Sequence, residues 1–231
     1  MRWGCEGLPR HECRGIKAPA KARLAAGCLT AVLGVAGVAR AQGRPEPSYG
    51  RLQGDLTLAA GLGGVVAARG GRAEGELRVR YLETAGLFAT YEDGALVGSA
   101  AEPTRVLTAG VELRPLFLAR WLTGRETRRA RFDLVLDSLG LELGATFAQP
   151  AGTSFASRAG LQAGLGLEVP IIAQASGPWL GFHAGVRWSD TALASGVVVN
   201  ADDRSAFVAI TLAWHQLVVT HLVDVGDEAP R

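Results

Sequence analysis

Hydrophobic and polar residues alternate with a period of two along most of the chain after residue 50. The clearest run is Leu161–Val169, in which every odd position is apolar and every even position is polar or glycine. Side chains of a β-strand point alternately to its two faces, so this period predicts a strand with one apolar and one polar face. The same period predicts seven further strands: Leu52–Leu62, Glu76–Tyr81, Leu87–Tyr91, Leu107–Leu113, Phe132–Phe147, Leu180–Trp188 and Ala206–Trp214.

The segments between these strands either lose the alternation or carry residues that interrupt a sheet. Pro115 ends one strand, because proline has no N–H to donate to a ladder. The apolar phase moves by one residue at Asp137-Ser138, which predicts a β-bulge within Phe132–Phe147. Leu116–Arg129 mixes large apolar residues with arginines and predicts an interfacial turn or a short amphipathic helix. The other connections are predicted at Gly63–Gly75, Glu83–Gly86, Glu92–Thr104, Gln149–Ser157, Gln174–Pro178 and Ser189–Arg204.

The tetrapeptide Glu83–Gly86 decides the number of strands. If it is a turn, the chain has eight strands, and two of the three connections on the side of the N-terminus are short. If Leu77–Tyr91 is instead one long strand, seven strands result and the long loops fall on that side. Outer-membrane barrels have short periplasmic turns and longer outer loops. We therefore predict an all-β, antiparallel, up-and-down arrangement of about eight strands.

The first 41 residues have the three parts of a secretory signal peptide. A basic leader ends at Arg23, the uncharged run Leu24–Val38 follows, and Ala39-Arg40-Ala41 has the small-x-small pattern of a cleavage site. A lipoprotein box at Leu24–Cys28 is the alternative, but there the basic residues precede the box and the apolar run follows it. We predict a signal peptide over residues 1–41, a linker over 42–50, a barrel domain over 51–224 and a polar tail over 225–231.

Removal of this leader changes the charge and the thiol content of the chain. Residues 42–231 hold 17 basic residues, all of them arginine, against 20 acidic ones, so the basic balance of the whole sequence comes from the leader. The charge of the exported chain therefore does not indicate a nucleic-acid partner. Cys5, Cys13 and Cys28 all lie in the leader, so the exported chain is expected to form no disulfides and to use no thiolate chemistry.

Alternation alone does not separate a soluble β-protein from a membrane barrel. After the leader the chain has no continuous apolar run of about 18 residues, so spanning by helices is excluded. The polar face is rich in glycine, which suits the crowded lumen of a small barrel. Aromatic residues also stand at the ends of the apolar runs, as in the interfacial girdles of membrane barrels. Four of them share the lipid-facing phase (Tyr81, Tyr91, Trp188 and Trp214), and Trp179 has the opposite phase.

With these strands assigned, the chain resembles the small outer-membrane β-barrel proteins of Gram-negative bacteria, of the OmpA or OmpW type, over roughly Leu52–Trp214. Ile210–Trp214 is similar to the alternating, aromatic-ended last strand of such proteins. Arg114–Leu118 and Asp137–Gly144 look like segments of uncharacterised members. The resemblance implies a monomeric, porin-like transmembrane barrel in the outer membrane, with membrane lipid and the barrel-assembly machinery as partners and with no enzymatic activity.

The polar face carries charges that a lumen has to accommodate. A Gly-apolar-Glu-apolar motif occurs three times, at Glu112, Glu142 and Glu168. An eight-stranded barrel has room for side chains but not for an open channel, and isolated charges inside it are unfavourable. We therefore predict a lumen plugged by ion pairs, with a narrow passive channel for ions or small solutes as the alternative. The ion-pair candidates are Asp55, Glu76, Arg78, Arg80, Glu112, Arg114, Glu142, Glu168, His183 and Arg187.

His183 raises the possibility of an enzyme, because lipid A deacylases are eight-stranded outer-membrane barrels that use a His-x-Ser pair. Gly185 stands at the serine position here, and Ser189 lies six residues after the histidine. A nucleophile must lie within hydrogen-bond reach of its base, so we predict no catalytic residue. His215, His221 and Asp224 lack metal-ligand spacing, and Asp202-Asp203 is interpreted as a solvated loop, so neither a metal nor a cofactor is expected.

The predicted function is a structural or interaction role in the outer membrane. A lipid-modifying enzyme and a soluble periplasmic barrel that binds an apolar ligand remain alternatives. In the soluble barrel the two faces exchange environments, so that Leu161, Leu165 and Leu167 line a cavity and Glu168 meets water. In the membrane barrel Leu165 faces lipid.

Overall fold

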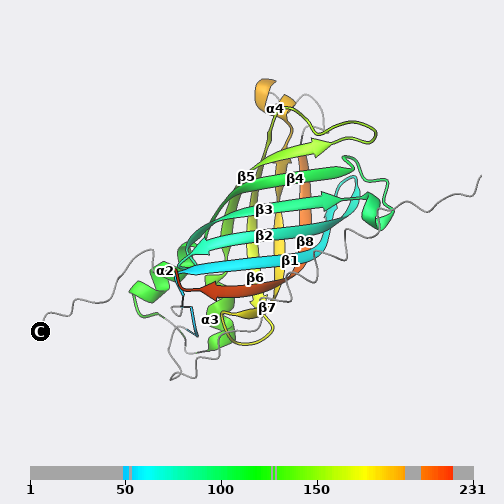
Figure 1. Cartoon of the computed structure of the whole chain (residues 1–231). Coiled ribbons are helices and arrows are strands. Elements are labelled where there is room, and N and C mark those ends of the chain that lie inside the picture. Colours follow the sequence, from blue (N-terminus) through cyan, green and yellow to red (C-terminus); the bar gives the residue numbers. More distant parts are fainter. Residues whose placement is uncertain (1–48, 52–53, 126, 128, 196–203, 221–231) are drawn as a thin grey trace, which may run out of the picture. The chain divides into compact units, whose positions relative to one another are not determined.

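The computed structural model describes residues 49–51, 54–125, 127, 129–195 and 204–220. The predicted leader, most of the linker, Asp202-Asp203 and the chain after Thr220 lie outside these residues. Eight antiparallel strands form a closed barrel in which each strand pairs with its neighbours in sequence and the last pairs with the first (Figure 1). The predicted eight-stranded, antiparallel, up-and-down barrel is thereby confirmed. The strands are β1 (Leu56–Ala67), β2 (Gly70–Tyr81), β3 (Ala85–Asp93), β4 (Arg105–Leu113), β5 (Gly140–Gln149), β6 (Gly160–Pro170), β7 (Gly177–Trp188) and β8 (Arg204–Val218).

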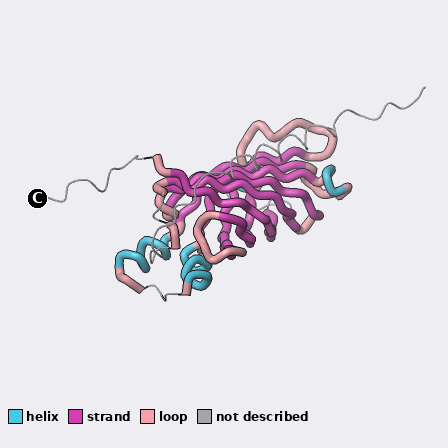
Figure 2. The backbone as a smooth tube through the Cα atoms, turned by 60° about the horizontal axis from the view of Figure 1, so that its bottom comes forward, coloured by secondary structure: helices cyan, strands magenta, loops and turns pink. Residues whose placement is uncertain are grey.

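The barrel has two ends, which carry different connections. We call the end at which β1 begins the base and the opposite end the rim. The base carries the β4–β5 connection, with helices α2 (Pro115–Leu122) and α3 (Ala130–Asp137). The rim carries the short helices η2 (Ala95–Val97) and α4 (Asp190–Ser195). Figure 2 shows α2 and α3 together beyond one end of the strands.

The turn predicted at Glu83–Gly86 is present but lies slightly earlier, at residues 82–84, and it settles the number of strands at eight. The β2–β3 turn consists of residues 82–84, and the Thr84 N–H donates to the Tyr81 carbonyl at 3.0 Å. Leu82 and Glu83 adopt positive φ angles of 46° and 54°, which non-glycine residues adopt mainly in tight turns.

The predicted loop at Gly63–Gly75 is wrong. β1 continues to Ala67 and β2 begins at Gly70, so the connection is only the two residues Ala68-Arg69. The glycines belong to paired strands that approach each other closely. A Cβ atom at Gly63 would lie 2.0 Å from the carbonyl oxygen of Ile210 on β8, so the glycine serves strand packing and does not mark a loop.

The predicted opening of a strand at Phe132–Leu136, with a bulge at Asp137-Ser138, is also wrong. These residues form α3, and β5 begins only at Gly140. Asp133 and Asp137 are four residues apart and both buried, as on one face of a helix. The shift of apolar phase marks the end of α3, where the Ser138 N–H donates to the Leu134 carbonyl at 3.1 Å.

The connection before α3 contains the short helix that the sequence allowed. Pro115 is the first residue of α2, a position where proline is favoured because its missing N–H has no partner there and its φ is already helical. β4 ends two residues earlier, at Leu113. The same proline therefore ends the strand and begins the helix.

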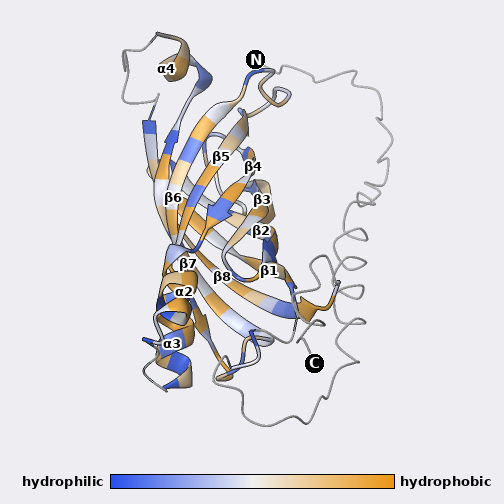
Figure 3. Ribbon diagram, turned by 90° about the vertical axis from the view of Figure 1, so that its left-hand side faces the viewer, coloured by the Kyte–Doolittle hydropathy of each residue, from blue (hydrophilic) through white to orange (hydrophobic). Residues whose placement is uncertain are grey.

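The barrel has an apolar outer wall, and its interior holds long charged side chains beside a small apolar cluster of Val65, Phe207 and Ala209. Outward residues such as Leu62, Leu77 and Leu165 are 57%, 62% and 53% exposed. Inward residues such as Arg80 and Glu168 are 1% exposed. Figure 3 shows hydrophobic and hydrophilic positions alternating along the strands. The large apolar side chains on this wall are thus the exposed ones and the long charged ones are buried, the reverse of the usual distribution in a soluble protein.

Gly110 on β4 offers a test of the close strand packing. A Cβ atom there would lie 2.1 Å from the Leu143 carbonyl oxygen and 2.4 Å from the Gly144 Cα atom, both of them backbone atoms. We expect Gly110→Ala to lower the free energy of unfolding by about 1–3 kcal/mol in urea titrations. Gly75→Ala is the matched control, because its Cβ would meet only a Leu62 methyl at 3.7 Å. Equal stability of the two variants would contradict this packing.

Candidate functional site: the charged lumen

The centre of the lumen contains two glutamates that face each other across neighbouring strands. Glu112 on β4 and Glu142 on β5 are directly paired in register, an arrangement that repels unless a cation lies between them. Arg78 of β2 supplies this cation, because its Nη1 lies 2.9 Å from Glu112 and 2.7 Å from Glu142. Its Nε also donates to Glu76 at 2.9 Å. One arginine therefore contacts carboxylates from three strands.

Two further arginines extend this arrangement toward the base. Arg80 donates from Nη2 to Glu168 at 2.6 Å and from Nε to Glu112 at 3.1 Å. Arg114 donates from Nε to Glu112 at 2.6 Å and also pairs with Glu168 and, at 3.4 Å, with Glu83. All of these charges are at least nine-tenths buried. We call Glu76, Arg78, Arg80, Glu112, Arg114, Glu142, Glu168 and His183 the base network.

Glycines make room for these long side chains. Glu76 is paired in register with Gly61, Glu168 with Gly181, and His183 with Gly166. A Cβ atom at Gly61 would lie 2.7 Å from Glu76 Oε1. The glycine-rich polar face in the sequence is therefore the space into which the charged side chains of the neighbouring strand fold.

His183 belongs to this network through its carboxylate and arginine neighbours. Its Nδ1 lies 2.9 Å from Glu142 Oε1, and its Nε2 lies 3.8 Å from Glu76 Oε2. Arg78 Nη2 lies 3.2 Å from its Nδ1. Ser189, the serine that follows His183 by six residues, lies in the rim connection, where its hydroxyl accepts a hydrogen bond from the Ala192 N–H. The histidine is only 4% exposed, so the wall and the network shield it from substrates outside the barrel.

A second charged cluster, which we call the rim network, consists of Arg72, Glu92, Gln162 and Arg187. Glu92 accepts from Arg72 Nε at 2.8 Å and from both Nη1 and Nη2 of Arg187. Arg187 Nε donates to Gln162 at 2.7 Å, and its guanidinium lies 4.1 Å from the centre of the Phe207 ring. Arg187 thus lies in the lumen as its phase predicts, but it joins this rim network and not the base network.

Two charged residues of the lumen, Glu92 and Arg72, were not among the predicted ion-pair candidates. One predicted candidate, Asp55, lies outside both networks. Glu92 and Arg72 were assigned to loops, although both have the inward phase of the strands that continue through them. Asp55 precedes β1, and its carboxylate accepts hydrogen bonds from the Thr220 N–H and hydroxyl at 2.6 Å. It therefore lies outside both networks. Extending the alternation through the glycine-rich segment would have found Arg72 and Glu74.

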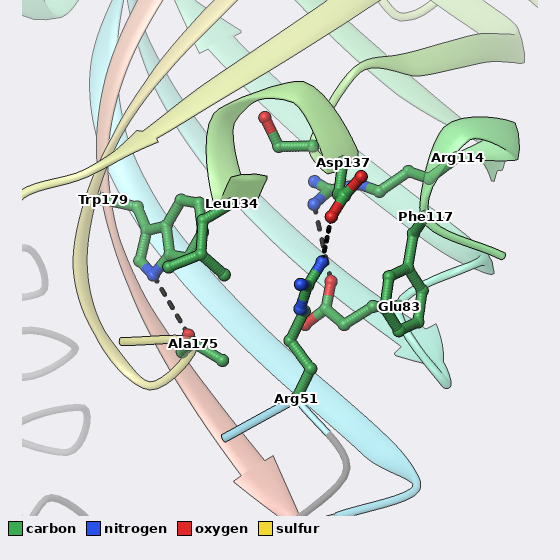
Figure 4. A pocket seen from close by; sticks show the side chains of 9 residues that line it. Arg51, Glu83, Arg114, Phe117, Leu134, Asp137, Ala175 and Trp179 are labelled. Carbon is green, nitrogen blue, oxygen red and sulfur yellow. Dashed lines mark hydrogen bonds and ion pairs between the residues drawn. The ribbon is translucent and has the colours of Figure 1, made fainter. Parts of the chain in front are cut away.

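The base of the lumen is closed by α3 and by the chain before β1. Arg51 forms an ion pair with Asp137 of α3, and its guanidinium lies 4.5 Å from the centre of the Phe117 ring. Figure 4 shows these side chains with Glu83, Arg114, Leu134 and Trp179 around a small cavity. The cavity leaves about 10 Å³, which is room for one water molecule. Trp179 stacks on His215 with the ring centres 4.8 Å apart.

Asp133 of α3 links the two helices of the α2–α3 hairpin through its side-chain contacts. It pairs with Arg120 of α2 and accepts hydrogen bonds from the Thr127 N–H and from Tyr49 Oη, both at 3.0 Å. Burial acts to raise the pKa of this carboxyl group, but the hydrogen bonds outweigh it and hold the pKa below its usual value. The ionised form of Asp133 therefore stabilises the folded hairpin.

This lowered pKa predicts a pH-dependent effect of Asp133→Asn. A carboxyl group with a lowered folded-state pKa stabilises the protein above its unfolded pKa of about 3.9 and loses this effect as the pH falls through its folded pKa. We expect the variant to unfold at lower urea concentration than the wild type at neutral pH. The difference should shrink as the pH falls below about 4. A difference that is the same across this range would contradict the role of Asp133.

The predicted girdle aromatics divide between the two ends of the wall. Tyr81 is the last residue of β2 and Trp214 pairs with Ala60 and Pro178, so both stand toward the base. Tyr91 and Trp188 stand toward the rim. Tyr91 and Trp214 are each 40% exposed, whereas Trp179 is buried in the lumen, as its opposite phase indicates.

These features define a closed, eight-stranded antiparallel barrel with an apolar outer wall and with buried ion pairs in its lumen. Neither a protein-family model nor a curated protein sequence matches the chain. In the described part of the chain, no helix is long and apolar enough to cross a membrane. Within the same ranges, no group of three or more histidine, cysteine, aspartate or glutamate side chains is arranged to hold a metal ion.

Proposed function

We propose that this protein is a transmembrane barrel of the outer membrane with a structural or interaction role. The observation that carries the proposal is the reversed polarity of the barrel. Fifteen leucines, valines and isoleucines of the outer wall, among them Leu62, Leu77 and Val66, are 40–67% exposed, while arginines and glutamates of the lumen are almost completely buried. An antiparallel barrel without free edges satisfies its backbone hydrogen bonds internally, which a chain in lipid requires. The fold is also compatible with the resemblance to small outer-membrane barrels.

Cell fractionation and gel migration test this location. We expect the protein to be found in the membrane fraction and to be released from it only by detergent. We also expect the unheated sample to migrate differently from the heated one, because a closed barrel resists unfolding in the gel buffer. Recovery in the soluble periplasm without detergent would contradict the proposal and support a soluble barrel that binds an apolar ligand.

The packing of the lumen favours a closed barrel over a passive channel. The base network and the rim network lie at two levels of the lumen, and Arg78, Glu112 and Glu92 are exposed by 2% or less. We expect the purified protein to give no steady conductance in planar lipid bilayers. A steady conductance whose ion selectivity changes in Glu168→Gln would instead support a channel through the base network.

The surroundings of His183 favour a structural role for this residue over lipid modification. Its ring is held by Glu142 and Arg78 inside the lumen. His183→Ala is therefore expected to leave the acylation of lipid A in the host membrane unchanged.

We assign contacts with partners to the rim, where η2 exposes Leu96 and Val97 by 70% and 57%.

A further inference from the structure

The α2–α3 hairpin carries apolar side chains that the described part of the chain leaves uncovered. Leu118 and Leu122 of α2 are 43% and 68% exposed and, being four residues apart, lie on one face of the helix. Phe132 of α3 is 51% exposed. Phe117 and Leu134 point the other way and are buried at the base of the lumen. Each helix thus has one apolar side against the barrel and another that faces outward.

Among the described residues around this outward side, the exposed charges are all positive. Between Pro115 and Leu139, the exposed ionisable side chains of the described residues are Arg125, Arg129 and Arg131. The described acidic side chains there, Asp133 and Asp137, are buried and paired with arginines. We call Leu118, Leu122, Phe132, Leu139, Arg125, Arg129 and Arg131 the hairpin surface.

The hairpin surface is continuous in sequence with the apolar wall of the barrel. Leu113, the last residue of β4, is 52% exposed and comes two residues before α2. Leu139 follows α3 and is 40% exposed, and the next outward residue, Leu141 on β5, is 52% exposed. Figure 3 shows α2 and α3 side by side at the base, just beyond the ends of the strands. If the wall lies in a bilayer, as proposed above, the hairpin falls where hydrocarbon gives way to headgroups.

We propose that the hairpin surface lies in the headgroup layer of the leaflet at the base and binds anionic phospholipids. The inference rests on the proposed membrane location of the barrel. Helices that lie in this layer combine leucine and phenylalanine on one side with arginines that contact lipid phosphates. Each arginine close to an anionic bilayer strengthens binding about fivefold. The three exposed arginines thus select an anionic surface, and the apolar residues hold the hairpin against it.

A fluorescent label at position 122 tests the inference in the full chain. Cys5, Cys13 and Cys28 are changed to serine, Leu122→Cys is labelled with a polarity-sensitive dye, and the protein is folded into vesicles. The vesicles contain either phosphatidylcholine alone or phosphatidylcholine mixed with phosphatidylglycerol. We expect the neutral quencher acrylamide to reach the label several-fold less well in the mixed vesicles. The double variant Arg125→Glu/Arg129→Glu should abolish this difference.

Two controls separate this inference from the membrane proposal. A label at Leu165→Cys, in the middle of the wall, should be protected in both kinds of vesicle; if it is quenched in both, the membrane location itself fails. If that label is protected but the label at 122 is equally accessible in both vesicles, the hairpin inference fails alone. Protection at 122 that is independent of lipid charge would also overturn the inference, because the hairpin surface would then not select anionic lipid. The double variant Arg158→Glu/Arg204→Glu reverses two exposed charges at the rim and should have no effect at 122.

Discussion

Replacing Arg78 with methionine is expected to lower the free energy of unfolding by about 3–5 kcal/mol. The methionine keeps an unbranched side chain but removes the guanidinium that separates Glu112 from Glu142 and pairs with Glu76. Three buried carboxylates then lose a partner, and two of them repel each other across neighbouring strands. Urea titrations of the protein folded in vesicles, followed by tryptophan fluorescence, measure the loss.

Arg105→Met is the matched control for this change. Arg105 also forms an ion pair with one carboxylate, Asp93, at 2.9 Å, but its side chain is 41% exposed. Water can replace the lost partner there, so we expect a much smaller loss than for Arg78→Met. Adding Glu112→Gln to Arg78→Met should restore part of the stability, because it removes one of the unpaired charges. If Arg78→Met and Arg105→Met were equally stable, the base network would not be the buried ion-pair plug described above.

Replacing Leu165 with arginine is expected to lower the free energy of unfolding by about 2–4 kcal/mol in vesicles. Leu165 lies at the middle of β6, opposite Leu141 on β5 and Ala184 on β7. Its side chain is 53% exposed on the outer wall, so an arginine would have to enter the hydrocarbon core or bend toward its edge. Urea titrations of the variant in vesicles measure this penalty.

Leu96→Arg is the matched control for the lipid environment. Leu96 is 70% exposed, but it lies in η2 at the rim, where we expect water. The change should therefore alter the free energy of unfolding by less than about 0.5 kcal/mol. If Leu165→Arg were as stable as Leu96→Arg, the outer wall would not face lipid.

The sequence predicted the strands well where their alternation was complete. The runs that became β4, β6, β7 and β8 have the predicted phase, and the turn after Tyr81 lies where it was expected. The prediction failed at glycines, which have no side chain to indicate a face, and at charged residues that are buried in the folded protein. The glycines of β1 and β2 hid two strand ends, because a glycine shows no preference for either face.

The helix α3 shows a different limit of sequence analysis. Phe132, Leu134 and Leu136 alternate as in a strand, and nothing adjacent in sequence indicates that Asp133 and Asp137 will be buried. Their burial depends on Arg51 and Arg120. Arg51 lies 86 residues before Asp137 in the chain. The local pattern therefore predicted a strand with a bulge at Asp137-Ser138 and gave no sign of a helix with two buried aspartates.

The sequence by itself determined which side chains point inward and which point outward, because a period of two fixes the face of every residue in a strand. It thereby indicated both the charged lumen and the apolar wall. Only the tertiary structure decided which charges meet. Arg78 contacts Glu142 across 64 residues of sequence and Arg187 contacts Glu92 across 95. These contacts depend on how the strands are staggered when the barrel closes, and no local pattern encodes the position of a residue along the barrel axis.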